Sequence, residues 1–236
     1  MATSLAASLG LPATPSQAGG GTVQRVYESL RKRIITLELP PDTTLSRTDL
    51  TETYGVSQTP IREALQLLKQ EGLVHIFPQS KTTVTRIDIP RTYEAHFLRV
   101  ALETEVCRRL AAERDAETVT RARSIVRMQE AIADDSSQIA VFQELDELFH
   151  QTLFAGLGRA GLHQLVRERS GHLERIRRLH LPEKGKVLNI LAGHYAILDG
   201  IASGDPEAAM AAIRDHLSQT VAKVEELRQE FPAYFD

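Results

Sequence analysis

Four side chains in the second half of the chain have the types and the spacing of a metal site. Asp146 and His150 stand four residues apart in FQELDELFHQTLF, which places a carboxylate and an imidazole on one face of a helix. His194 in NILAGHYAILDGI and His216 in AAIRDHLSQTVAKV each share a helical stripe with aliphatic residues. The pattern therefore predicts that all four side chains face the interior of one helical bundle.

The chemistry that this set of side chains could perform is the binding of a divalent cation. A single histidine on an apolar stripe is more often a core residue with satisfied hydrogen bonds. Three histidines and an aspartate facing one interior are different, because burying that many titratable groups without partners would be costly. One cation would satisfy them all, and three imidazole nitrogens with a carboxylate oxygen suit Zn²⁺, with Ni²⁺ and Mn²⁺ as alternatives.

The elements that must position these residues are amphipathic helices, and we find no convincing strand from residue 92 onward. Their boundaries carry capping and breaking signals, such as the sequence Gly204-Asp205-Pro206, where the proline suits the first position of a helix. The predicted helices cover residues 92–114, 116–134, 137–156, 159–181, 186–203 and 206–230. We therefore expect a mainly α protein whose C-terminal part is an all-α bundle of about six helices.

The first part of the chain has a different organisation, centred on TDLTETYGVSQTPIR at residues 48–62. Ser46 is a suitable N-cap for a short helix that ends at Tyr54, and Gly55 suits the sharp turn that follows. Ser57 begins a second helix. The other predicted elements of this module are a preceding helix at 23–37 and two strands at 73–77 and 82–86. A helix, a turn, a second helix and a β-wing are typical of a module that binds DNA.

The first turn of the second helix is predicted to enter the major groove. Arg62 can form a bidentate pair with guanine, and Gln58 can do the same with adenine. Ser57 and Thr59 carry short hydroxyl groups suited to phosphate. The alternative is a winged helix that makes only protein contacts, but the polar first turn has no role in a core.

Composition and cysteine content narrow the class of protein. At 236 residues the chain has room for one large domain or two of ordinary size. Its single cysteine, Cys107, excludes an intrachain disulfide and a cysteine-based zinc site. No run approaches the roughly 18 apolar residues that span a bilayer, and residues 1–21 lack the positive charge of a signal peptide. We expect a cytoplasmic protein with no membrane partner and a disordered tail at 1–21.

Charge is distributed unevenly along the chain, whose net charge is −3. Residues 22–86 contain nine Lys or Arg and seven Asp or Glu, a balance of +2. Residues 87–236 contain 19 basic and 24 acidic residues, a balance of −5. A mildly basic head on an acidic body suits a DNA-binding protein that gains affinity by forming a dimer.

These observations divide the chain into five segments. The predicted segments are the tail at 1–21, a winged helix-turn-helix DNA-binding domain at 22–86, a linker at 87–91, a helical domain at 92–230 that contains the candidate metal site and a C-terminal tail at 231–236.

The stretch GVSQTPIREALQLLKQEGLV resembles the winged helix-turn-helix of the GntR family of bacterial regulators, whose pattern is roughly VSRTPVREAL followed by LEAEGLV. The resemblance runs from about Val26 to Val84. The family usually has arginine where this chain has Gln58 and Thr48, although Arg47 stands beside the latter. A glycine is usual at the wing tip, where this chain has Lys81, which could still reach a narrow minor groove. The resemblance implies DNA binding through these residues, with a changed operator sequence.

The arrangement D-x3-H, H-x2-I-L-x2-I-x2-G-D and R-x-H-L is similar to the FCD ligand-binding domain of the FadR subfamily, in its VanR-like branch. The resemblance implies that a metal is held by Asp146, His150, His194 and His216. It also implies that Arg99, within LRVALE, binds the carboxylate of an effector. The alternative for Arg99 is a salt bridge with Glu103. Arg178 is a second candidate for the effector, although RIRRLH is more typical of a solvated face.

We therefore expect a metal-containing, effector-responsive transcriptional repressor that acts as a homodimer on a pseudo-palindromic double-stranded DNA operator. A small carboxylate effector would release it, and the regulated operon would serve the catabolism of an organic or aromatic acid. Two alternatives come from other classes. One is a metal-dependent hydrolase that uses the Asp/His₃ site, and the other is an architectural DNA-binding protein with no metal site.

Overall fold

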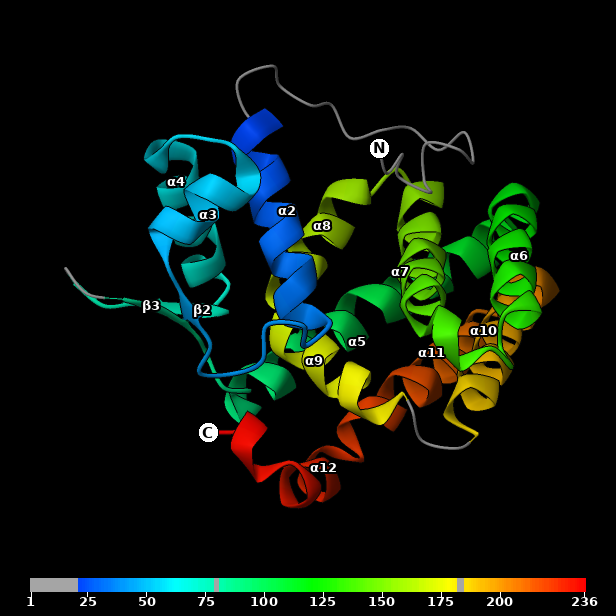
Figure 1. Ribbon diagram of the computed structural model, residues 1–236. Coiled ribbons are helices and arrows are strands. Elements are labelled where there is room, and N and C mark those ends of the chain that lie inside the picture. The colour runs from blue at the N-terminus through cyan, green and yellow to red at the C-terminus, as the bar shows by residue number, and fades with distance from the viewer. Residues whose placement is uncertain (1–20, 79–80, 182–184) are drawn as a thin grey trace. The chain divides into compact units, whose positions relative to one another are not determined.

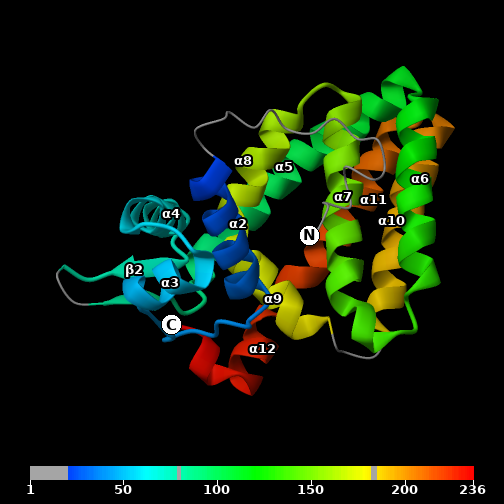
Figure 2. The same ribbon diagram turned by 45° about the horizontal axis from the view of Figure 1, so that its top comes forward.

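The computed structural model describes residues 21–78, 81–181 and 185–236 of the chain, which form two compact units. The first unit ends at Thr85, and the second contains Arg86–Asp236 with the short segment Ile35–Leu37. Figure 1 and Figure 2 show the elements of each unit from two directions. The tail expected at 1–21 lies outside the described residues, except for Gly21, which begins the first helix.

The first unit is a winged helix-turn-helix. Its elements are α2 (Gly21–Ile35), β1 (Thr44–Leu45), α3 (Arg47–Tyr54), α4 (Gln58–Gln70), β2 (Val74–Ile76) and β3 (Thr82–Val84). The strands form an antiparallel sheet in the order β1-β3-β2. The three helices and the sheet share one apolar core, which includes Leu30, Ile61, Leu65, Leu68 and Val84. The predicted helix-turn-helix and wing are confirmed, whereas β1 was missed because a strand of two residues shows no alternating pattern.

Local signals explain the turn between α3 and α4. The Ser46 side chain accepts a hydrogen bond from the backbone amide of Asp49, as expected of an N-cap. Gly55 has φ 63°, a left-handed conformation that glycine adopts without the strain that a Cβ would cause. Ser57 occupies the N-cap of α4, but its side chain makes no capping bond. The recognition helix is therefore fixed at its start by the turn and not by a cap.

A buried polar network fixes the other end of α4. Glu71, which caps α4, accepts a hydrogen bond from the Tyr27 hydroxyl and from Arg31 Nε at 2.8 Å, and both partners belong to α2. The Arg31 and Glu71 side chains are almost fully buried. Removing either charge would break this buried ion pair, which holds α4 to α2.

The second unit is the predicted all-α bundle. Its elements are α5 (Ile89–Glu113), α6 (Ala116–Ala131), η1 (Ser136–Gln138), α7 (Ile139–Gly156), α8 (Ala160–Arg169), α9 (Gly171–His180), α10 (Lys186–Ser203), α11 (Pro206–Val221), α12 (Val224–Glu230) and η2 (Pro232–Tyr234). The mainly α fold is confirmed, but the described part of this unit has eight α-helices where the sequence predicts about six.

Two of the predicted helices are each divided in two. The first division falls at Ser170, whose hydroxyl donates to the Val166 carbonyl at 2.7 Å and so competes with the regular helical pattern. The second falls at Lys223, whose amide bonds to the Thr220 carbonyl, three residues back. Such a tightened turn is common where a helix ends. Each division lets the following short helix take a new direction.

Helices α10 and α11, which carry His194 and His216, lie side by side because small residues stand where they meet. A Cβ on Gly200 of α10 would lie 2.8 Å from the Ala209 Cα of α11, which is closer than packed atoms allow. Glycine at this position therefore permits the two backbones to approach closely. This contact brings His194 of α10 near His216 of α11, and α5 packs against both helices.

The linker and the C-terminal tail are more ordered than the sequence predicts. Asp88 caps α5, which already begins at Ile89 inside the linker expected at 87–91. The tail expected at 231–236 contains η2, and Phe235 forms a parallel bridge with Ile87. The cause is burial, because both side chains belong to an apolar cluster that local sequence cannot reveal.

Among the described residues, none of the helices has the length and the apolar character needed to cross a membrane.

Candidate functional site

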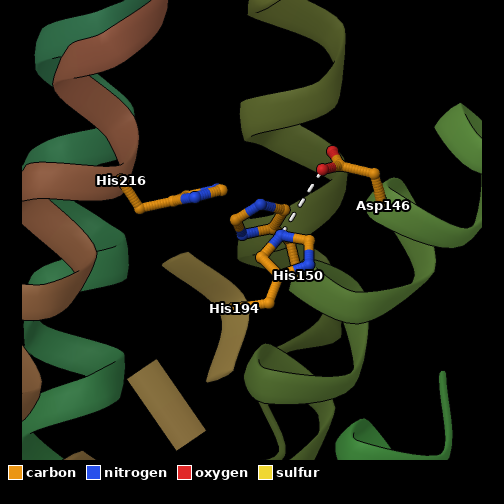
Figure 3. A group of neighbouring side chains, drawn as sticks. All are labelled: Asp146, His150, His194 and His216. Carbon is orange, nitrogen blue, oxygen red and sulfur yellow. Dashed lines mark ion pairs between the residues drawn. The ribbon is translucent and has the colours of Figure 1, made fainter. Parts of the chain in front are cut away.

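Four side chains converge inside the second unit, as Figure 3 shows. Asp146 and His150 come from α7, His194 from α10 and His216 from α11. All four are buried, and each offers one ligand atom within 4.8 Å of the others. The structure therefore brings together the four residues that the sequence pattern singles out.

The chemistry of these atoms fits a bound cation. Asp146 Oδ1, His150 Nε2, His194 Nε2 and His216 Nδ1 are buried, and none has a hydrogen-bond partner among the described residues. The ion pair drawn in Figure 3, between His194 Nε2 and Asp146 Oδ1, spans 3.4 Å. Orphaned polar atoms are costly inside a protein. One divalent ion accepting three nitrogens and one oxygen would satisfy all of them.

Neighbouring polar groups orient two of the imidazoles. Gln129 Oε1 lies 2.9 Å from His194 Nδ1, and Glu103 Oε2 lies 2.6 Å from His150 Nδ1. In each ring the contacted nitrogen is Nδ1, so Nε2 is left for the centre of the cluster. Metal-binding histidines usually have such a partner, which fixes the ring orientation and the tautomer.

Electrostatics keep the carboxylates charged and two of the imidazoles neutral. Burial alone would raise the pKa of Asp146, but the Arg177 guanidinium, which donates to it, holds that pKa well below its usual range. Burial opposes ionisation of Glu103 as well, yet Arg99 and His150 lower its pKa. Burial lowers the pKa of His194, and Asp146 offsets only part of this effect.

His216 follows the same rule more strongly. Burial is the main cause that lowers its pKa well below the usual value, and the neighbouring His194 and His150 add to the effect. A neutral imidazole keeps the lone pair that a metal requires. Asp146, His194 and His216 therefore present ligand atoms in the protonation state that a cation needs.

A cavity beside the cluster is lined by three cationic side chains. Its empty space, including its opening to solvent, is about 480 Å³. Asp146 and His216 form part of its wall, and so do Arg99, Arg177 and Lys186. Lys186 Nζ donates to Gln219 Oε1 at 3.4 Å. The remaining lining residues are Phe142, Gln143, Leu181, Ile190, Leu217, Gln219 and Thr220. This wall is suited to a small anion next to the cluster.

Arg99 has both of the placements that the sequence allows. It lines the cavity, and its Nε also lies 2.6 Å from Glu103 Oε1 in a buried ion pair within α5. Arg178 is placed differently, because it donates to Gln143 Oε1 at 3.2 Å and is not among the described residues that line the cavity. The arginine of α9 that reaches the cavity is Arg177. Its position four residues after the buried Leu173 is the sequence signal that could have identified it.

The candidate DNA-binding residues all lie on the surface of the first unit. On α4 and its N-cap these are Ser57, Gln58, Thr59 and Arg62. The remaining candidates, at the start of α3 and beside the wing tip, are Arg47, Thr48 and Lys81, and they are exposed too. The opposite side of α4, with Ile61, Leu65 and Leu68, is buried in the core. One face of α4 is therefore available for a groove of DNA.

A winged helix-turn-helix with a free recognition face, joined to a helical domain with a buried ligand cluster, defines a DNA-binding transcriptional regulator. The family described as bacterial regulatory proteins, gntR family, matches residues 22–84, and the FCD domain matches residues 94–219. The chain belongs to the GntR family, and its second domain is an FCD domain.

The chain is similar over most of its length to several regulators. It is 38% identical over 222 residues to an uncharacterized HTH-type transcriptional regulator of Streptomyces ambofaciens, covering 93% of this chain and 92% of that protein. It is 28% identical over 212 residues to the HTH-type transcriptional repressor RspR of Escherichia coli, covering 90% and 92%. The structure of E. coli McbR/YncC has the same fold, with a TM-score of 0.74 and 17% identity over 89% of this chain and 98% of that one.

These families and relatives are transcriptional regulators and not enzymes. The hydrolase alternative therefore has no support.

Proposed function

We propose that this regulator is a metal-containing repressor of a catabolic operon for an organic or aromatic acid, and that a small carboxylate releases it from DNA. The observation that carries the proposal is the set of four buried ligand atoms within 4.8 Å of one another, beside a cavity with three cationic side chains. The repressor named among the relatives supports the direction of control.

In this proposal, one set of residues binds the metal and another binds the effector. Asp146, His150, His194 and His216 would hold the cation, most simply Zn²⁺, with Ni²⁺ or Mn²⁺ as alternatives. When bound, the metal supplies a Lewis-acidic position for an oxygen of the effector. Arg99, which lines the cavity, would pair with a carboxylate of the effector, because a guanidinium can bind both carboxylate oxygens.

We further propose that Arg177 and Lys186 make the cavity selective for anions. Both line the same wall as Arg99, and Asp146 is the one acidic side chain among the described lining residues. With three cationic side chains and one acidic side chain on its wall, the cavity favours an anionic ligand over a cationic one.

Operator binding would use the exposed face of α4 and the wing in the cytoplasm. Two copies of the chain would each place one α4 in the major groove of a pseudo-palindromic site. Exposed apolar side chains of the second unit support a homodimer: Tyr93 and Phe97 of α5 are exposed, the latter by 76%, as are Leu162 and Leu165 of α8. Large apolar and aromatic side chains are typical of the core of an interface.

Native mass spectrometry of the purified protein tests the metal. We expect one Zn²⁺ per chain in the wild type and loss of zinc in Asp146→Asn, which keeps the shape of the side chain but removes its charge. Equal zinc content in the two proteins would contradict the proposal. The matched control is Asp199→Asn. Asp199 lies on α10, is exposed, and forms an ion pair with Arg123 of α6.

DNA selection from a random library tests the operator. We expect the wild type to enrich a two-fold symmetric sequence. Phe97→Asp places a charge in the proposed dimer surface, so this variant should enrich a single half-site or no sequence at all. Binding that depends on salt but not on sequence would exclude specific repression.

A further inference from the structure

The connection between the two units is held from two sides. Residues 86–88 follow directly after the last residue of the DNA-binding unit. On one side lies the C-terminal segment, residues 231–236. The Ile87 amide donates to the Tyr234 carbonyl at 2.8 Å, and the Asp236 amide donates to the Ile87 carbonyl at 3.2 Å. These two bonds form the parallel bridge between Ile87 and Phe235.

Helix α9 holds the same three residues from the other side. Arg175 Nη2 donates to the Arg86 carbonyl at 3.2 Å, and the Asp88 amide donates to His172 Nδ1 at 3.0 Å. Arg175 Nη2 also lies 2.8 Å from His172 Nδ1, so the two α9 side chains support each other. Backbone groups of all three residues 86–88 are therefore hydrogen-bonded to α9 or to the C-terminal segment.

Residues 86–88 and their partners on α9 and the C-terminal segment also include buried side chains, which stabilise this arrangement. The Ile87 side chain is fully buried in a cluster with Ile176 of α9, Phe235 and two residues of α12, Val224 and Leu227. Arg175 has no exposed surface, and burial lowers its pKa to about 10 while the Asp236 charge acts in the opposite direction. Burying a guanidinium is costly, and the hydrogen bond from Arg175 to the Arg86 carbonyl offsets part of that cost.

The helix that holds residues 86–88 also reaches the candidate metal site. Arg177 is two residues after Arg175 on α9, and it donates a hydrogen bond to Asp146. α9 packs against α5, α11 and α12, and Figure 2 shows it between α12 and the helices of the cluster. One helix of ten residues therefore contacts a candidate metal ligand and the connection to the DNA-binding unit.

We propose that α9 and the C-terminal segment form a latch on residues 86–88, which couples the state of Asp146 to the DNA-binding unit through Arg177. The coupling rests on the proposed function for its signal, whereas the latch does not. Asp146 is shared between Arg177 and the centre of the cluster, so a change in its charge environment acts on Arg177 and hence on α9. A coupling of this kind requires two arrangements of the packed helix with different affinity for the ligand.

Hydrogen–deuterium exchange of the full chain tests the latch without any ligand. We expect Phe235→Ala to speed exchange in peptides that cover residues 86–88 by roughly 100-fold, because a buried Phe→Ala change removes extensive packing. Phe235→Leu keeps most of the apolar volume and should speed exchange by a smaller factor, about threefold to tenfold, which decides the matter if the alanine variant does not fold. Phe77→Ala, on the exposed wing, is the control and should leave 86–88 unchanged.

The same experiment with Zn²⁺ alone tests the coupling. Saturating Zn²⁺ should speed exchange at 86–88 by about threefold or more, the change expected when one hydrogen bond weakens. Arg177→Met, tested at zinc concentrations at which native mass spectrometry shows the site filled, should lose this response. Arg178→Met is the matched control, because Arg178 contacts Gln143 and not Asp146, and it should keep the response.

The possible outcomes separate the two proposals. Slow exchange at 86–88 in Phe235→Ala and Phe235→Leu would overturn the latch. Zinc uptake with no response at 86–88, or with an equal response in Arg177→Met, would overturn the coupling while metal binding stands. Failure of the wild type to take up zinc would refute the proposed metal site and this coupling together, and the latch would still be decided by the Phe235 variants.

Discussion

Gly193 offers a sharp test of the metal cluster, because the absence of a side chain at this position leaves room for the imidazole of His216. A Cβ at this position of α10 would lie 2.6 Å from His216 Nδ1 and 3.3 Å from the Cγ of the same ring. Ordinary contacts begin near 3.4 Å, so the ring must retreat by about 0.8 Å in Gly193→Ala. The helices themselves cannot separate easily, since Gly200 keeps α10 and α11 in close contact.

The size of the effect follows from this displacement. Alanine is favoured over glycine inside a helix by about 1 kcal/mol, so the fold should survive the change. A metal site responds differently, because ligands must stay within a few tenths of an ångström of their positions. Loss of support for a ligand typically lowers metal affinity by about 10–100-fold, and we expect a decrease of this size for Zn²⁺.

Competition against a chromophoric chelator measures the zinc affinity directly. Gly161→Ala is the matched control, because a Cβ on Gly161 of α8 would meet no atom within 4 Å among the described residues. It makes the same chemical change in a helix but should leave zinc affinity unaltered. If Gly193→Ala binds zinc as tightly as the wild type, His216 does not bind the metal from the position that it occupies in the cluster.

Three other predictions concern stability and DNA. Addition of EDTA to zinc-loaded protein should lower its thermal midpoint, because a ligand at 100 times its Kd stabilises the folded state by about 2.7 kcal/mol, and an architectural protein without a metal site would show no shift. Arg62→Ala should weaken operator binding in gel-shift assays by about 1–3 kcal/mol and relax selectivity at one base pair, whereas Lys81→Ala should weaken binding to all sequences and reduce the salt dependence. Glu71→Gln should destabilise the first unit by about 3–5 kcal/mol in urea unfolding, since it breaks the buried ion pair with Arg31. Glu38→Gln breaks the more exposed pair with Arg33 and should cost less than about 1 kcal/mol; equal losses would contradict the role of burial.

The parts of this molecule that could be predicted from sequence are those governed by neighbours along the chain. The four-residue spacing of Asp146 and His150 places both on one face of α7, and the structure agrees. Ser46 and Gly55 mark the start and the end of α3 for reasons of local hydrogen bonding and backbone freedom. His194 and His216 were found because each lies on an apolar stripe, which only a buried helix requires.

The parts that could not be predicted depend on contacts between distant segments. Arg177 and Arg178 are adjacent, and although the spacing from Leu173 favours Arg177, its contact with Asp146 depends on how α9 is rotated against α7. The pairing of Ile87 with Phe235 joins the two ends of the second unit, so no local pattern could show it. Pro90 predicts a linker at 87–91, and the position of residues 231–236 at the end of the chain predicts a tail. Burial of Ile87 and Phe235 in one apolar cluster overrides these local signals.

Glu103 shows how the metal and effector functions can depend on each other. It lies 2.6 Å from Arg99 Nε through one oxygen and 2.6 Å from His150 Nδ1 through the other. The arginine proposed to bind the effector and a histidine proposed to bind the metal therefore share one buried carboxylate. A carboxylate ligand that draws Arg99 away leaves Glu103 to His150, which strengthens the contact that orients this imidazole. Binding of either ligand should then raise the affinity for the other by the same factor, because coupling between two sites is reciprocal.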